Sequence, residues 1–237
     1  MCKYFIYMYH STFCNILYFA TFFGIINVVS TNTIKLLFPT KINDYLLLKV
    51  GEKCASTTHS IIVAYLGIRV LMSPGIWLHR IHFISEESLL LSNISCGYFL
   101  YDFIMCLARL NIVGPVFLGH AVMAFTINCI SVVSGVGHFY TAAFLVWEIS
   151  TPFVNVRYFM NKLQIRGENI INALIIFLFL FCRIIWGTFI YYIIIIDTIY
   201  VSEGLLLKIP VFIAFLMNAL NYYWFYKMVK IVYSKLQ

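Results

Sequence analysis

The chain has 237 residues, of which 62% are hydrophobic, 18% aromatic and 11% charged. Soluble domains carry about a quarter charged residues, so this composition, with a mean hydropathy of +0.92, excludes a soluble enzyme, a disulfide-rich secreted scaffold and a disordered tail. The net charge of +7 lies between apolar blocks rather than along one basic face, which indicates orientation in a membrane and no binding of nucleic acid.

Seven apolar segments are long enough to cross the roughly 30 Å hydrocarbon core of a bilayer as helices. In chain order they are predicted at residues 8–29, 56–76, 89–109, 113–133, 138–157, 170–196 and 208–226. The string Ser73-Pro74-Gly75 ends the second segment, and Pro210 opens the last. The predicted fold class is therefore all-α, a polytopic transmembrane helix bundle with about seven spans.

The lysines and arginines divide unevenly between the two sides that seven spans create. One side receives eleven of them: Lys35, Lys41, Lys49, Lys53, Arg109, Arg157, Lys162, Arg166, Lys227, Lys230 and Lys235. The other side receives three, which are Lys3, Arg80 and Lys208. Because cytoplasmic loops are enriched in lysine and arginine, we expect a cytoplasmic C-terminus and a lumenal N-terminus.

The cysteines predict no metal site. The chain has seven of them with no Cys-x-x-Cys pair, and five lie inside apolar segments, at Cys14, Cys96, Cys106, Cys129 and Cys182. Such cysteines behave as small hydrophobic residues rather than as a disulfide framework or a zinc site.

Several ionisable side chains lie inside the predicted spans, where one charge costs about 2.5–3.5 kcal/mol at mid-helix. Four of them fall in one layer of the cytoplasmic half, each on a different span: His59, Asp102, His120 and Glu148. Arg69 and Arg183 fall one layer further from the cytoplasm. The shared depth predicts a polar pocket. The alternative is a set of polar contacts that only hold the helices together.

Asp102 and His120 form the best-defined pair of this layer. A short turn joins their spans, so the two helices are antiparallel neighbours, and each residue lies about nine positions from that turn. If both point inward, the carboxylate of Asp102 orients the His120 imidazole and leaves its other nitrogen as a base. Tyr98 lies one helical turn before Asp102 and Tyr101 directly precedes it, so Tyr98 can satisfy a carboxylate oxygen.

The fifth predicted span contains a proline. Pro152 lies four residues after Glu148 and has no backbone N–H, which leaves the Glu148 carbonyl without its helical partner. We expect a kink at this point that helps to open a cavity. Arg69 or Arg183 can pair with Glu148 or with a phosphate.

Three sequence motifs occur in the second, third and fifth predicted spans. They are Ser56-Thr-Thr-His59-Ser60, Gly97-Tyr-Phe-Leu-Tyr101-Asp102 and Glu148-Ile-Ser-Thr151-Pro152-Phe-Val-Asn155-Val-Arg157. Their order and spacing resemble the TLC domain, which ceramide synthases, translocating-chain-associated membrane proteins and smaller TLC domain-containing proteins share. The resemblance is closest to the smaller proteins. It covers about residues 41–237 and leaves residues 1–40 as an N-terminal span and loop.

The resemblance implies a core of six helices around a lipid cavity, in the endoplasmic reticulum or another internal membrane, with a role in lipid metabolism or homeostasis. In ceramide synthases a His-His pair serves acyl transfer from acyl-CoA to a sphingoid amine. The matching string here, Phe117-Leu-Gly119-His120-Ala121, contains one histidine. The resemblance also implies membrane lipids as partners and acyl-CoA as a co-substrate, with no bound cofactor. Assembly as a homodimer or a heterodimer is left open.

We therefore predict a multi-pass membrane protein that binds an acyl lipid, with His120 and Asp102 as the catalytic residues of an acyltransferase. The polar side chains of the cavity are predicted to be His59, Arg69, Tyr98, Tyr101, Glu148, Asn155 and Arg183. Two alternatives stay open. One is a non-catalytic lipid sensor with the same cavity, and the other is a trafficking or cargo partner that depends on the 77–88 loop and the tail from Lys227.

Overall fold

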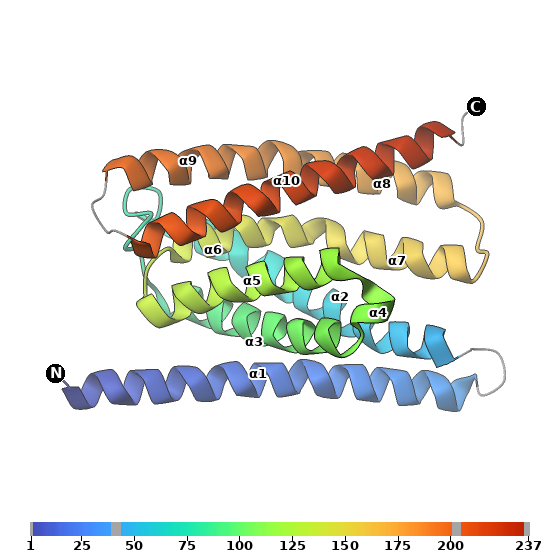
Figure 1. Cartoon of the computed structure of the whole chain (residues 1–237), viewed down its shortest axis with the longest axis horizontal. Helices are drawn as coiled ribbons and strands as arrows, with labels where there is room; N and C mark the ends of the chain where they lie inside the picture. The colour runs from blue at the N-terminus through green and yellow to red at the C-terminus, as the bar shows by residue number, and fades with distance from the viewer. Residues whose placement is uncertain (1, 39–43, 201–204, 235–237) are drawn as a thin grey trace.

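The computed structural model of the chain is a bundle of helices that run along one common axis (Figure 1). It describes residues 2–38, 44–200 and 205–234, with side chains described within 12–38, 45–167, 169–200 and 208–234. The side chains of Lys3, Lys41 and Lys235, which enter the predicted charge division, lie outside this description. No strand occurs in the described ranges, which confirms the predicted all-α fold class.

The described chain passes seven times along the bundle (Figure 1). Four passes are made by α1 (Cys2–Leu37), α2 (Asp44–Leu71), α3 (Glu86–Ala108) and, after the single turn α4 (Leu110–Val113), α5 (Pro115–Ser134). The fifth consists of α6 (His138–Leu145), the 3₁₀ helix η1 (Val146–Ser150) and α7 (Thr151–Lys162). The sixth and seventh are α8 (Glu168–Phe179), the π-helix η2 (Leu180–Ile185) and α9 (Trp186–Tyr200), then α10 (Leu205–Ser234).

Five helical stretches of the described chain are long and apolar enough to cross a membrane. They are Thr12–Leu37, Tyr45–Leu71, Glu86–Ala108, Pro115–Ser134 and Asn169–Tyr200. The predicted span 138–157 differs because η1 breaks it into two short helices. The predicted span 208–226 lies inside α10, whose middle carries Asn218, Asn221 and the run Tyr222–Trp224, and these residues lower its hydropathy.

The second helix differs from its predicted bounds of 56–76. It begins at Asp44, well before the apolar run, because charged residues of its first turns have partners. Lys49 lies 2.7 Å from Glu52, and Glu52 also binds Arg109 of the α3–α4 junction. The helix ends at Leu71, two residues before the Ser73-Pro74-Gly75 string, at which Gly75 has a φ of 78°.

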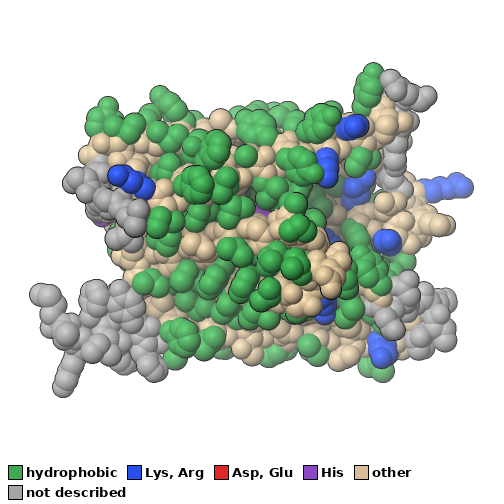
Figure 2. Space-filling model, viewed as in Figure 1, with side chains coloured by type: hydrophobic (Ala, Val, Ile, Leu, Met, Phe, Trp, Pro, Cys, Tyr) green, Lys and Arg blue, Asp and Glu red, His purple; other side chains and the backbone are tan. Residues whose placement is uncertain are grey.

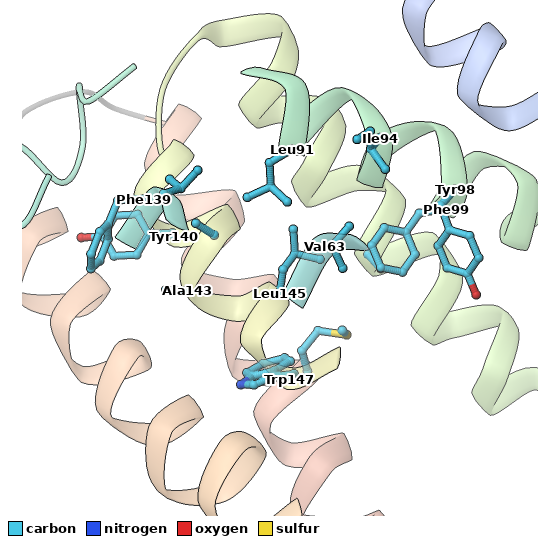
Figure 3. Close-up of a cluster of buried hydrophobic side chains, with 14 of the residues drawn as sticks. Val63, Leu91, Ile94, Tyr98, Phe99, Phe139, Tyr140, Ala143, Leu145 and Trp147 are labelled. Atoms are coloured by element: carbon cyan, nitrogen blue, oxygen red, sulfur yellow. The ribbon is translucent and has the colours of Figure 1, made fainter. Parts of the chain in front are cut away.

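The core lies where α2, α3 and α6 pack together. Val63, Leu91, Ile94, Phe139 and Leu145 interdigitate there with exposed fractions of at most 8% (Figure 3). The α3 helix is the central one of the bundle. In its most apolar stretch of 18 residues, 61% of the residues are buried, whereas the corresponding share in the other four candidate spans is 17–33%. Large apolar side chains instead cover the outer surface of the bundle (Figure 2), as expected where lipid replaces water.

The two ends of the bundle carry different charge. On the face shown in Figure 2, lysine and arginine side chains gather at the end where α7 meets α8 and where α10 finishes. The Cys2 end of α1 and the Ser234 end of α10 lie at opposite ends of the bundle (Figure 1). This arrangement agrees with an odd number of passes and with the predicted division of the basic residues.

The segment between α2 and α3 is anchored at the less basic end. Arg80 binds the carboxylate of Asp197 on α9 through two bonds, Nε to Oδ2 at 2.6 Å and Nη2 to Oδ1 at 2.7 Å. The hydroxyl of Tyr140 on α6 donates to the same carboxylate. The hydrogen bond to Asp197 raises the pKa of the Arg80 guanidinium above its ordinary value. These contacts tie α6 and α9 to the connecting segment.

Candidate functional site

A cavity lies between α5, α6, η1, α9 and α10. Its volume is about 870 Å³ when the open space at its mouth is included. Its walls are mostly apolar and aromatic, with Phe99, Phe144, Ile194 and Met217 contributed by four different helices. Sites for apolar ligands are lined mainly by hydrophobic and aromatic side chains with a few polar groups. The cavity therefore has the lining of a site for an apolar ligand.

One face of α5 contributes polar groups to this cavity. His120, Ala124, Asn128 and Ser131 are spaced by three or four residues, so they lie on one helical face, and all four line the cavity. His120 Nδ1, Asn128 Oδ1 and Ser131 Oγ are buried and have no hydrogen-bond partner among the described residues. Buried polar atoms normally have partners. We define these four residues as the α5 stripe, which offers bonding positions to a ligand.

Glu148 lines the same cavity from η1, and its carboxylate is held from behind by Arg183 of η2. Arg183 is 7% exposed, and its Nη2 lies 3.5 Å from Glu148 Oε1. The remaining bonds of its guanidinium go to Trp147 O, Ser150 Oγ, Thr151 Oγ1 and Asn221 Oδ1, at 3.0–3.2 Å. Arg183 therefore pairs with Glu148 and uses its donors within the protein.

The two irregular segments of the bundle meet at Arg183. The 3₁₀ helix η1 and the π-helix η2 pack against each other in the middle of passes five and six. Irregular backbone at membrane depth is tolerated where it is buried in protein or lines a cavity, and π-helical turns are frequent at functional sites. The position of both breaks beside the cavity supports its assignment as the functional site.

His59, Tyr98 and Asn155 lie outside this cavity, in the packing between α2, α3 and α7. The fully buried ring of His59 stacks on Tyr98 with centroids 3.8 Å apart, and neither ring nitrogen has a partner among the described residues. Asn155 Nδ2 donates to Thr57 Oγ1 at 2.9 Å. Phe99 separates His59 from the cavity, because its ring contacts His59 at 5.3 Å and also lines the cavity.

Asp102 and Tyr101 line a second cavity of about 290 Å³ together with Glu52. Asn27 Nδ2 donates to the Tyr101 hydroxyl at 2.7 Å, and no hydrogen bond joins Asp102 to His120 within the described ranges. The structure thus does not bring the expected Asp102–His120 pair together. Asp102 lines the second cavity beside Glu52, whereas the α3 residue whose ring contacts His120 is Phe99, with centroids 6.4 Å apart.

Arg69 also lies away from the cavity. Because α2 ends at Leu71, Arg69 stands in the last helical turn and its side chain is 52% exposed. Its Nη2 lies 2.5 Å from Glu87 Oε1, and its guanidinium lies over the ring of Tyr65. The depth predicted for Arg69 depended on a helix that continued to residue 76.

Sequence reasoning missed two cavity residues on α5. Asn128 and Ser131 follow His120 by eight and eleven positions, a spacing that returns to the same helical face. A search for uncharged polar residues at helical spacing from His120 would have found them. Only ionisable residues entered the predicted layer.

The cavity and the bundle belong to a chain with recognisable relatives. A family profile described as the TLC domain matches residues 49–230. The chain is 28% identical over 228 residues to an uncharacterized TLC domain-containing protein of Schizosaccharomyces pombe, which covers 90% of this chain and 76% of that protein. It is 28% identical over 134 residues to TLC domain-containing protein 4-B of Danio rerio, covering 53% and 46% of the two chains.

A third relative is Topoisomerase I damage affected protein 4 of Saccharomyces cerevisiae, 28% identical over 167 residues. That match covers 61% of this chain and 55% of the yeast protein, so the chain spans about half the length of this relative. The profile match extends over most of the chain and includes both irregular segments and the α5 stripe. The chain is a membrane protein that belongs to the TLC domain family.

Proposed function

We propose that this protein binds an acyl lipid in the cavity beside α5 and acts in lipid metabolism or homeostasis in the endoplasmic reticulum or another internal membrane. The observation that carries the proposal is an apolar cavity lined by three residues of one helix face, each with a buried polar atom that has no hydrogen-bond partner among the described residues. Apolar walls suit acyl chains, and a few placed polar groups suit a head group.

Filling the cavity tests the binding proposal. Ile127 lines the cavity, so Ile127→Trp places a larger side chain inside it, whereas Val122 is 40% exposed on α5 and is not a lining residue. We expect Ile127→Trp to reduce capture of a photoactivatable acyl lipid by about tenfold, since lost contacts worth roughly 1.4 kcal/mol suffice. The purified full-length protein is irradiated with the probe and the labelled fraction is measured.

Val122→Trp is the matched control, because it adds the same side chain to the same helix outside the cavity. It should capture the lipid like the natural sequence. Both variants are first compared by gel filtration, so that a misfolded protein is recognised. Equal capture by the two tryptophan variants would contradict binding in this cavity.

Acyl transfer is the second candidate, favoured by His120, which lines the cavity and whose buried Nδ1 has no hydrogen-bond partner among the described residues. In this reaction the imidazole takes the proton of an amine or hydroxyl while that nitrogen or oxygen attacks the thioester carbonyl of acyl-CoA. The carbon–sulfur bond breaks, coenzyme A leaves as a thiol after taking up the proton, and an amide or ester remains. Glu148 is the carboxylate that shares the cavity with His120, since Asp102 lines the other one.

Substitution of His120 separates the two candidates. His120→Gln removes the base but keeps a polar side chain, so we expect acyl transfer to fall by about 10²–10⁴-fold while lipid capture persists. Transfer is measured with radiolabelled acyl-CoA and an amine or hydroxyl acceptor in vesicles. The exposed His79 provides a control, because His79→Gln should leave transfer unchanged. Undiminished turnover by the His120 variant would exclude His120 as the base and leave lipid sensing as the function.

A further inference from the structure

The charges around the cavity are balanced inside the protein. Among the described lining residues, the ionisable side chains are His120, Tyr140 and Glu148. The Tyr140 hydroxyl is bound to Asp197, and the Glu148 carboxylate faces the guanidinium of Arg183 at 3.5 Å. The charge of the Glu148 carboxylate at the cavity is therefore balanced by the Arg183 guanidinium before any ligand binds.

The cation beside Glu148 already uses four of its five N–H donors inside the protein. Arg183 Nε is shared between Trp147 O and Ser150 Oγ, and its Nη1 binds Asn221 Oδ1 at 3.2 Å. Its Nη2 binds Thr151 Oγ1 at 3.0 Å in addition to Glu148. A phosphate or carboxylate in the cavity would add a negative charge near Glu148 without an unengaged cation in the described lining. Uncompensated charge in such a site is strongly unfavourable.

The polar atoms on the α5 stripe are suited to accept hydrogen bonds. Asn128 donates its Nδ2 hydrogen to Ala124 O at 2.8 Å, so the unpartnered atom of this amide is the acceptor Oδ1. Ser131 Oγ, nearly one helical turn further, has no partner among the described residues and can accept as well as donate. Both residues line the cavity. The matching groups of a ligand are O–H or N–H donors.

We propose that the cavity selects uncharged lipids whose head group carries hydroxyl or amide N–H donors, and that it disfavours lipids with an anionic phosphate or carboxylate. The inference rests on the proposed lipid-binding function and specifies the chemical class of its ligand. Apolar walls receive the acyl chains, Asn128 and Ser131 accept from the head group, and the Glu148–Arg183 pair leaves no net charge to attract an anion.

Two probes that differ by one phosphate test the inference. The full-length protein in nanodiscs is irradiated with photoactivatable diacylglycerol or with phosphatidic acid that carries the same acyl chains. We expect diacylglycerol to be captured more by a factor on the order of ten or greater, because the buried phosphate charge has no counterion. Equal or preferential capture of phosphatidic acid would overturn the inference and leave the proposed function intact. Capture of neither probe would overturn both.

Two substitutions extend the test with opposite expectations. Glu148→Gln leaves the charge of Arg183 without its partner, so capture should shift toward phosphatidic acid. Asn128→Leu keeps a similar volume but removes the acceptor, so diacylglycerol capture should fall several-fold with no gain for phosphatidic acid. Asn111→Leu, at an exposed position of α4, is the matched control and should behave like the natural sequence. An unchanged capture ratio in both Glu148→Gln and Asn128→Leu would refute the selectivity.

Discussion

At the scale of single residues, Arg183 shows how a charge is kept inside a bilayer-spanning bundle. Its guanidinium bonds to a carbonyl, two hydroxyls, an amide and a carboxylate, supplied by η1, α7 and α10. A planar group with five donors can serve partners in several directions, which a lysine ammonium on a flexible stem cannot reproduce. The same side chain lies over the ring of Phe179 at 5.0 Å. Arg183 thus fastens the two helix breaks together.

Removal of Arg183 should therefore destabilise the fold. Arg183→Met leaves the half-buried Glu148 carboxylate and the buried Asn221 amide without their partner, and breaking a buried pair costs up to about 3–5 kcal/mol. We expect a clear fall in the melting temperature, measured in detergent by the loss of the monodisperse gel-filtration peak. Arg166→Met, at an exposed position between α7 and α8, is the control and should melt like the natural sequence. Equal melting of the two variants would show that Arg183 does not hold the breaks.

At the scale of elements, the helices of the fifth and sixth passes are interrupted by η1 and η2, and the helices of the other passes are continuous or nearly so. The break expected at Pro152 is present as the 3₁₀ turns of η1, after which Pro152 stands in the first turn of α7. Proline is well tolerated there because its missing N–H would have no helical partner. The broken passes both line or support the cavity, and α6 of the fifth pass also packs against α2 and α3 in the core.

The first helix is held by glycines on its neighbours. A Cβ at Gly97 of α3 would lie 2.5 Å from Phe19 Cβ and 2.8 Å from Ile16 O of α1. A Cβ at Gly51 of α2 would lie 2.5 Å from Asn27 O of α1. Small residues permit such close backbone approach between membrane helices, where packing rather than water drives association. The two glycines therefore fix the distance of α1 from the core.

A methyl group at Gly97 should push α1 away. We expect Gly97→Ala to cost about 1–3 kcal/mol, as overpacking does, because the neighbouring atoms include backbone that cannot rotate aside. Gly119→Ala is the matched control: nothing lies within 4 Å of its Cβ position, so helix propensity should make it neutral or stabilising by roughly 0.5–1 kcal/mol. Melting temperatures of both variants in one detergent provide the comparison. A Gly97→Ala protein as stable as Gly119→Ala would argue against close packing of α1.

At the scale of the whole molecule, the bundle is polarised along its length. Basic side chains gather at the end that holds the α7–α8 connection and the end of α10 (Figure 2). The opposite end holds the α2–α3 segment, in which Arg80 is neutralised by Asp197. Since cytoplasmic loops of membrane proteins are enriched in lysine and arginine, this polarity predicts that the basic end faces the cytoplasm.

The orientation is tested by tags at three positions. We expect a tag after the last residue and a tag inserted at 163–167 to be degraded by protease added to sealed microsomes, because both sit at the basic end. A tag at the N-terminus should be protected until detergent opens the membrane. The 163–167 insertion is the internal control, since it lies at the same end as the C-terminal tag. Equal accessibility of the tags at the two termini would contradict seven passes.

The prediction of individual site residues was less complete than that of the fold. His120 and Glu148 line the cavity, and Arg183 supports it from behind, as their rarity in apolar segments suggested. His59 is buried behind Phe99, and Asp102 and Arg69 lie elsewhere. Asn128 and Ser131 escaped notice because uncharged polar residues are common enough in membrane helices to give no signal by themselves.

The all-α fold, the order of the passes and the uneven division of basic residues can be predicted from the sequence, because each depends on the hydropathy or charge summed over a segment. The tertiary structure alone decided which side chains meet. Contact depends on how far each helix is rotated about its axis and shifted along it. Side-chain packing sets both, and the close contacts at Gly51 and Gly97 set them for α1. For this reason His120 shares a cavity with Glu148, and Asp102 faces Glu52 in another.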